Sequence, residues 1–95
     1  MAVVLIDGEN TRRSTWPNVS RRELVARAAR WAERHGHDAR VVWETDESAD
    51  DAIARAVRDV DPPVWVITSD RELRRRVEAY AERVIGGGAF IREIA

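Results

Sequence analysis

The sequence predicts an α/β fold, with a parallel sheet of about four strands and helices packed against it. Short apolar runs alternate along the chain with longer segments whose apolar residues recur at helical spacing. The apolar runs are almost continuous, which is typical of parallel strands buried on both faces. With 95 residues, the chain is long enough for one hydrophobic core and too short for two. We therefore expect a single domain over residues 1–95.

The first half of the chain contains two predicted strands with a helix between them. Residues Ala2–Ile6 form the first apolar run, and residues 8–19 are predicted to form a long loop. The helix begins at Ser20, a capping residue with a glutamate three positions on, and it ends at Gly36. Residues Ala39–Trp43 are predicted to form the second strand.

The second half repeats this alternation. Ser48 caps a second helix, which the Asp-Pro-Pro sequence at residues 61–63 ends. The third strand is the apolar run VWVIT at residues 64–68, and Ser69 is predicted to open a third helix. A short fourth strand at residues 84–85 leads through a run of glycines into a brief terminal segment.

Composition and charge exclude several classes of protein. There is no cysteine, so disulfides and thiolate metal sites are excluded. No apolar run approaches the roughly 20 residues of a membrane span, and the N-terminus lacks the basic region of a signal peptide, so we expect a cytoplasmic protein without a membrane partner. The net charge of -1 argues against coating nucleic acid by bulk charge. Every basic residue is arginine, and the clusters Arg12–Arg13 and Arg74–Arg76 can bind phosphates locally.

Acidic residues follow three of the predicted strands. Asp7 comes directly after the first strand, Asp70 follows the third, and Asp50 and Asp51 lie in the first turn of the helix after the second. The carboxyl ends of parallel strands share one edge of the sheet, where ligands bind. If the first and third strands are neighbours, Asp7 and Asp70 face each other there. Asp50, Asp51 and Asp70 also have a structural explanation, because each can complement a helix dipole. Asp7 has no such explanation, since a buried strand gains nothing by ending in an acid.

Clustered carboxylates are unfavourable unless a cation neutralises them or one takes up a proton. Oxygen ligands without cysteine suit Mg²⁺ or Mn²⁺, and such sites typically act on phosphodiesters. Asn10 is interpreted as orienting a phosphate or the Asp7 loop, or as a cap, and Ser69 as a partner of the site or a cap. Trp16 lies beside two arginines and is either a base-stacking residue or, as we expect, an anchor that packs its loop against the sheet.

Three motifs in order, LIDGEN, SADDAI and VWVITSDREL, resemble the NYN domain, in particular the YacP-like branch of the PIN-like ribonuclease superfamily. The glycine-rich GGGAF near the C-terminus is similar to the family's ending, so the resemblance covers nearly the whole chain. It implies a Rossmann-like three-layer sandwich and cleavage of RNA that depends on Mg²⁺ or Mn²⁺. The positions that match the family's metal-binding and catalytic acids are Asp7, Asp50 and Asp70, with Asn10, Ser69 and Asp51 supporting them.

One departure from the family pattern concerns the middle of the chain, which is unusually short. Glu44 stands where relatives carry a further acid, and Glu9 falls at a variable position. The favoured prediction is a metal-dependent endoribonuclease. The alternative is a catalytically degenerate RNA-binding or assembly module of the same fold, natural or engineered to a minimal length.

The resemblance also names the expected partners. We expect RNA as the partner, with its backbone held by Arg12, Arg13, Arg71 and Arg74. A homodimer is compatible with the sequence, because a domain this short gains by burying more surface.

Two other protein classes with acids at this edge of the sheet fit less well. A receiver-like domain would need a lysine, which the chain lacks, and a haloacid-type phosphatase would need Asp-x-Asp after the first strand, where this chain has DGEN.

Overall fold

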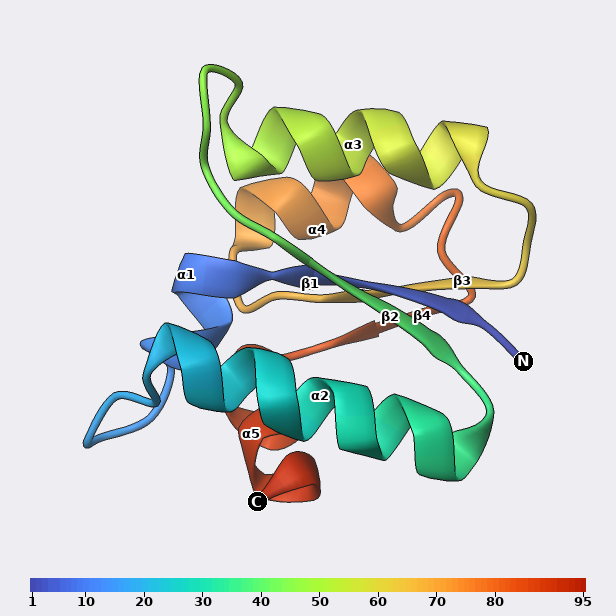
Figure 1. Cartoon of the computed structure of the whole chain (residues 1–95). Coiled ribbons are helices and arrows are strands. Elements are labelled where there is room, and N and C mark those ends of the chain that lie inside the picture. Colours follow the sequence, from blue (N-terminus) through green and yellow to red (C-terminus); the bar gives the residue numbers. More distant parts are fainter.

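The computed structural model describes all 95 residues, which form one four-stranded sheet (Figure 1). All three strand pairs are parallel, and the strand order is β2-β1-β3-β4. This confirms the predicted α/β class and the predicted parallel sheet of four strands. The strands are β1 (Val3–Asp7), β2 (Asp38–Val42), β3 (Val64–Ile67) and β4 (Arg83–Ile85).

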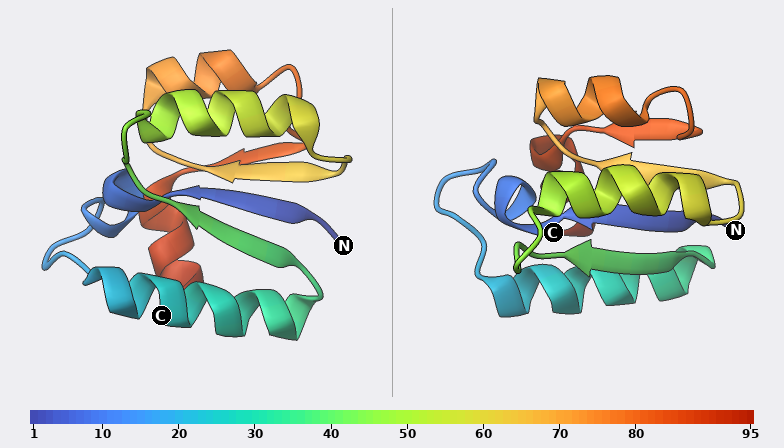
Figure 2. Two further views of the ribbon diagram at one scale, coloured as in Figure 1. Left: turned by 45° about the horizontal axis from the view of Figure 1, so that its top comes forward. Right: turned by 90° about the horizontal axis from the view of Figure 1, so that it is seen from above.

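Helices cover both faces of the sheet, which gives the three layers visible in Figures 1 and 2. On one face lie α2 (Arg21–His35), α5 (Gly87–Ile94) and the short α1 (Gly8–Arg12). The opposite face carries α3 (Ala49–Asp59) and α4 (Arg71–Val77). No helix has both the length and the apolar character that crossing a bilayer requires.

The central strand β1 contributes to a separate hydrophobic core on each face of the sheet. Val4 and Ile6 belong to a cluster of 11 buried residues under α2 and α5. Leu5 points the other way, into a cluster of 7 buried residues under α3 and α4. Side chains of a strand alternate between its two faces, so a strand buried on both faces must be apolar throughout. This is the reason for the continuous apolar run at the start of the chain.

The prediction of a loop over residues 8–19 is wrong at its start, because α1 begins directly after β1. Gly8 makes this possible: a Cβ at this position would lie 2.5 Å from the ring of Trp43. The glycine after Asp7 therefore marks a close approach between two segments. The terminal segment is also helical, and a Cβ at Gly87 would lie 3.0 Å from the Cα of Thr11, where α5 meets α1.

Two of the predicted helix caps are present, and the third lies one residue later than predicted. Ser20 and Ser48 each accept a hydrogen bond from the third backbone amide of their helix, at 3.1 Å. At α4, however, the capping residue is Asp70, whose Oδ1 accepts from two backbone amides at 2.8 and 3.2 Å. The Ser69 hydroxyl instead accepts from the backbone amide of Gly87 at 2.9 Å, which joins the β3–α4 loop to α5.

Candidate functional site

The candidate site lies at the carboxyl end of the sheet, between β1 and β3. Ile6 pairs with Ile67, so Asp7, which ends β1, lies next to Thr68, which directly follows β3, as expected if the first and third strands are adjacent. The chain then leaves β1 toward β2 on one side, and leaves β3 toward β4 on the other. Such a divergence opens a crevice beyond the strand ends, where ligands of α/β proteins bind.

The structure brings the three predicted catalytic acids to one cavity of about 250 Å³. Asp7 enters from β1, Asp50 from the first turn of α3, and Asp70 from the start of α4. Asn10 also lines the cavity, together with two further acids. The complete lining is Asp7, Glu9, Asn10, Glu44, Ser48, Ala49, Asp50 and Asp70.

The acids of this cavity disfavour one another's charge. Burial raises the pKa of Asp7 to about 6, against the hydrogen bond from Thr68 that lowers it, and the charges of Asp50 and Asp70 raise it further. Burial also raises the pKa of Asp50, and the negative charges of Asp70 and Asp51 raise it further, while the positive charge of Arg76 opposes the change. A proton or a cation in the cavity would relieve this repulsion.

Thr68 is a residue of the site that the sequence analysis did not identify. It is buried, and its hydroxyl donates to Oδ2 of Asp7 at 2.9 Å. The Thr68 hydroxyl oxygen in turn accepts a hydrogen bond from the backbone amide of Asp70 at 3.1 Å. One hydroxyl thus fixes Asp7 relative to the loop that carries Asp70. The only signal in the sequence is a polar residue that ends the apolar strand just before Ser69 and Asp70.

Asn10 and Ser69 hold the segments around the cavity together. Oδ1 of Asn10 accepts from the backbone amide of Ser69 at 2.8 Å, which links α1 to the β3–α4 loop. The Ser69 side chain bonds Gly87 and does not line the acidic cavity. Asp51 does not line it either, because its exposed carboxylate pairs with Arg76 at 3.0 Å, between α3 and α4.

The donor set of the cavity suits a hard divalent cation. Carboxylates and one amide oxygen are the ligands that Mg²⁺ and Mn²⁺ prefer, and no softer ligand competes with them. No three acidic or histidine side chains, however, lie close enough together to hold one ion in this structure. Cation binding would therefore require the acids to move closer together.

A second hollow, of about 470 Å³, adjoins the acidic cavity and shares Asp70 with it. Arg71, Arg74 and Arg75 line this hollow, and all three are exposed and form no ion pair. Arg71 and Arg74 were predicted from the sequence to bind RNA, whereas Arg75 was not. Its lining is Thr68, Ser69, Asp70, Arg71, Arg74, Arg75 and Glu78.

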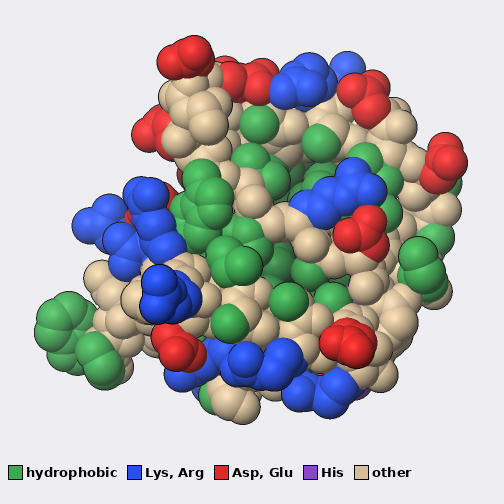
Figure 3. Space-filling model, in the orientation of Figure 1, with side chains coloured by type: hydrophobic (Ala, Val, Ile, Leu, Met, Phe, Trp, Pro, Cys, Tyr) green, Lys and Arg blue, Asp and Glu red, His purple; other side chains and the backbone are tan.

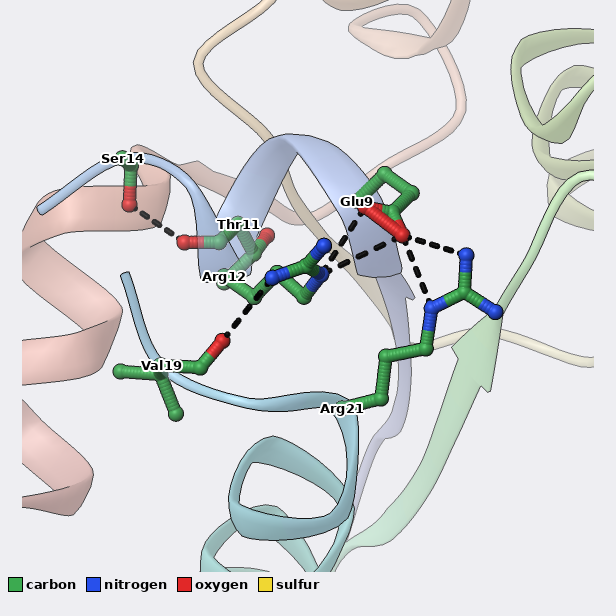
Figure 4. A network of polar contacts seen from close by, with 6 residues as sticks. All are labelled: Glu9, Thr11, Arg12, Ser14, Val19 and Arg21. Atoms are coloured by element: carbon green, nitrogen blue, oxygen red, sulfur yellow. Dashed lines mark hydrogen bonds and ion pairs between the residues drawn. The ribbon is translucent and has the colours of Figure 1, made fainter. Parts of the chain in front are cut away.

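The two predicted RNA-binding residues near α1 differ in their surroundings. Arg13 is exposed and forms no ion pair. Arg12 is already engaged, because its Nε pairs with Glu9 at 2.9 Å and its Nη1 donates to the carbonyl of Val19 at 3.4 Å (Figure 4).

Comparison with known proteins identifies the fold. No protein-family model and no curated protein matches the sequence. A solved structure, the crystal structure of Rae1 (YacP) from Bacillus subtilis, is similar over 99% of this chain and 75% of that chain, with a TM-score of 0.83 and 19% sequence identity. The chain therefore has a YacP-like α/β fold, in agreement with the fold that the sequence motifs imply. At this identity the likeness concerns the fold alone.

Proposed function

We propose that this protein binds Mg²⁺ or Mn²⁺ in the acidic cavity and hydrolyses phosphodiester bonds of RNA there. The observation that carries the proposal is the convergence of Asp7, Asp50 and Asp70, from three separate segments, on one cavity at the carboxyl edge of the sheet. RNA as the substrate is inferred from the resemblance of the motifs to the NYN domain. The YacP-like fold is consistent with that inference.

Four acids of the cavity and the neighbouring Thr68 have parts in the proposed reaction. Asp7, Asp50 and Asp70 would hold the ion, and Glu44 adds a further carboxylate to the same cavity. When bound, the ion polarises the phosphate and lowers the pKa of a water molecule. Asp7 has a pKa of about 6, so it is mostly ionised and able to bind a cation at neutral pH. Thr68 holds that carboxylate in one orientation before the substrate arrives.

The hollow on α4 would hold the RNA backbone next to the cleaved bond. Arg71, Arg74 and Arg75 lie on one face of the helix, at positions three and four residues apart. Their unpaired guanidinium groups suit phosphate oxygens, and Asp70 borders both this hollow and the acidic cavity. A chain of phosphates bound along α4 would therefore enter the acidic cavity beside Asp70.

A second candidate is an RNA-binding module that does not cleave. Two observations favour it: one oxygen of Asp70 is committed to capping α4, and the acids do not close around a single ion position. The two candidates share the fold and the arginine hollow, and they differ only in whether the acids support hydrolysis.

The experiment is incubation of a labelled single-stranded RNA with the protein in Mn²⁺, in Mg²⁺ and in EDTA. Asp70→Asn is the test variant, because asparagine still caps a helix but lacks the charge. Asp51→Asn is the matched control, since Asp51 lies outside the cavity. We expect metal-dependent cleavage that is lost in Asp70→Asn and retained in Asp51→Asn. Binding without cleavage would select the second candidate, and cleavage in EDTA would refute the metal-dependent mechanism.

A further inference from the structure

Trp16 is the most exposed of the large hydrophobic residues, with 89% of its surface accessible. It lies in the loop between α1 and α2, where Pro17 and Asn18 are exposed as well. The expectation that Trp16 anchors this loop against the sheet is therefore wrong. Tryptophan is highly buried on average in folded proteins, so its position at an exposed tip calls for a partner.

The base of this loop is held by a network of contacts (Figure 4). The backbone amide of Val19 donates to the carbonyl of Arg12 at 3.0 Å, and the Arg12 side chain donates back to the carbonyl of Val19. Glu9 accepts from both Arg12 and Arg21, at 2.9 and 2.6 Å, which ties α1 to α2. Because both ends of the loop are held, Trp16 is presented from a fixed base, which lowers the entropy cost of binding.

The loop lies at the same end of the molecule as the acidic cavity. It follows α1, which begins directly after Asp7, and it projects at the end where α3 and α4 also begin (Figures 1 and 2). Figure 3 shows the hydrophobic tip standing away from the body at the lower left, with basic side chains next to it. Arg13 lies three residues before Trp16 and is exposed and unpaired.

We propose that Trp16 stacks on an unpaired base of an RNA strand bound in the acidic cavity, with Arg13 contacting a phosphate between the two. This rests on the proposed function, because RNA is taken as the ligand. It adds the substrate class: the strand must be single-stranded near the cleaved bond, since bases inside a duplex are already stacked and cannot offer a free face. Single-strand binding surfaces combine exposed aromatic rings with cationic side chains, and the segment of Arg13 and Trp16 offers one of each.

The test is the affinity for single-stranded and duplex RNA, measured in EDTA so that metal-dependent cleavage does not interfere. Stacking on one base predicts that Trp16→Ala weakens single-strand binding about 5- to 150-fold and leaves duplex binding unchanged. Trp16→Phe retains an aromatic face and should keep most of the affinity. Tyr80→Ala removes another exposed aromatic residue, beyond the far end of α4, and should have no effect. Binding should also quench the fluorescence of the wild type more than that of Trp16→Phe.

Equal single-strand affinity in the wild type and Trp16→Ala would overturn the stacking proposal. So would a dimer that Trp16→Ala dissociates while its RNA affinity is unchanged, because the partner of Trp16 would then be a second copy of the chain. Cleavage with the same KM in both proteins would refute stacking while the nuclease proposal stands. Binding that depends on Trp16, without cleavage in Mn²⁺, would refute the nuclease and support stacking. Absence of any RNA binding, in EDTA and in Mg²⁺ alike, would refute both.

Discussion

Replacing Asp7 by asparagine is expected to stabilise the fold at neutral pH. The side chain is only 4% exposed, and its pKa is raised from an ordinary value of 3.8 to about 6. Each pKa unit corresponds to about 1.4 kcal/mol, so ionising Asp7 in the folded protein costs about 3 kcal/mol of stability. Because the pKa of Asp7 is raised on folding, the contribution of this group to stability is greatest below the unfolded value of 3.8, and it is lost as the pH rises through about 6.

Asp7→Asn removes the charge and keeps an oxygen that can accept the hydrogen bond from the Thr68 hydroxyl. The variant should therefore exceed the wild type in unfolding free energy by up to about 3 kcal/mol at about pH 7.5, and the difference should shrink to about 0.5 kcal/mol near pH 4. Urea unfolding in EDTA across this range measures it, with Asp51→Asn as an exposed control. Adding Mn²⁺ should stabilise the wild type but not Asp7→Asn. A variant that is less stable than the wild type at neutral pH would refute the reasoning.

Three further predictions concern the neighbours of the site. Thr68→Val should weaken Mn²⁺ binding about 10- to 100-fold in a titration, because the hydrogen bond to a ligand is lost, and Thr68→Ser should restore it. Gly8→Ala should lower the unfolding free energy by about 1–3 kcal/mol in urea, since its Cβ would overlap a packed indole ring, whereas Gly88→Ala should be neutral or stabilising. Arg74→Ala should weaken RNA binding and lower the slope of affinity against salt by about 0.7, and Arg30→Ala, on the exposed side of α2, should leave both unchanged.

Most of the fold follows from local sequence patterns. Apolar strands buried on both faces, capped helices and their alternation require a parallel sheet, and a parallel sheet places Asp7 and Asp70 at one edge. The short helix α1 was not predictable, because five residues are too few to show helical periodicity. The choice between Ser69 and Asp70 as the cap of α4 was not predictable either. Both residue types cap helices, and the contact that occupies Ser69 comes from α5, which is distant in the sequence.

The candidate site shows the same division between local and tertiary information. Asp50 and Asp51 are neighbours in the first turn of α3, and successive helical positions point about 100° apart, so one of them faces the cavity and the other faces Arg76. The spacing in the sequence does not show which of the two acids faces the cavity. The role of Thr68 could hardly be predicted from the sequence, because it comes from the hydrogen bonds of its hydroxyl to Asp7 and Asp70, which only the folded structure brings together. The exposure of Trp16 likewise could not be predicted, because it depends on the path of a loop whose ends are joined by a contact between Arg12 and Val19.

The central claim, that the acidic cavity is a metal site, is tested most directly by Mn²⁺ binding measured by electron paramagnetic resonance. The wild type is compared with Asp50→Asn, which changes a side chain in the cavity, and with Asp51→Asn, which changes its neighbour outside it. The account predicts that Asp50→Asn loses at least about ten-fold in Mn²⁺ affinity and that Asp51→Asn matches the wild type. Equal affinities for all three proteins, or no binding by the wild type, would contradict it.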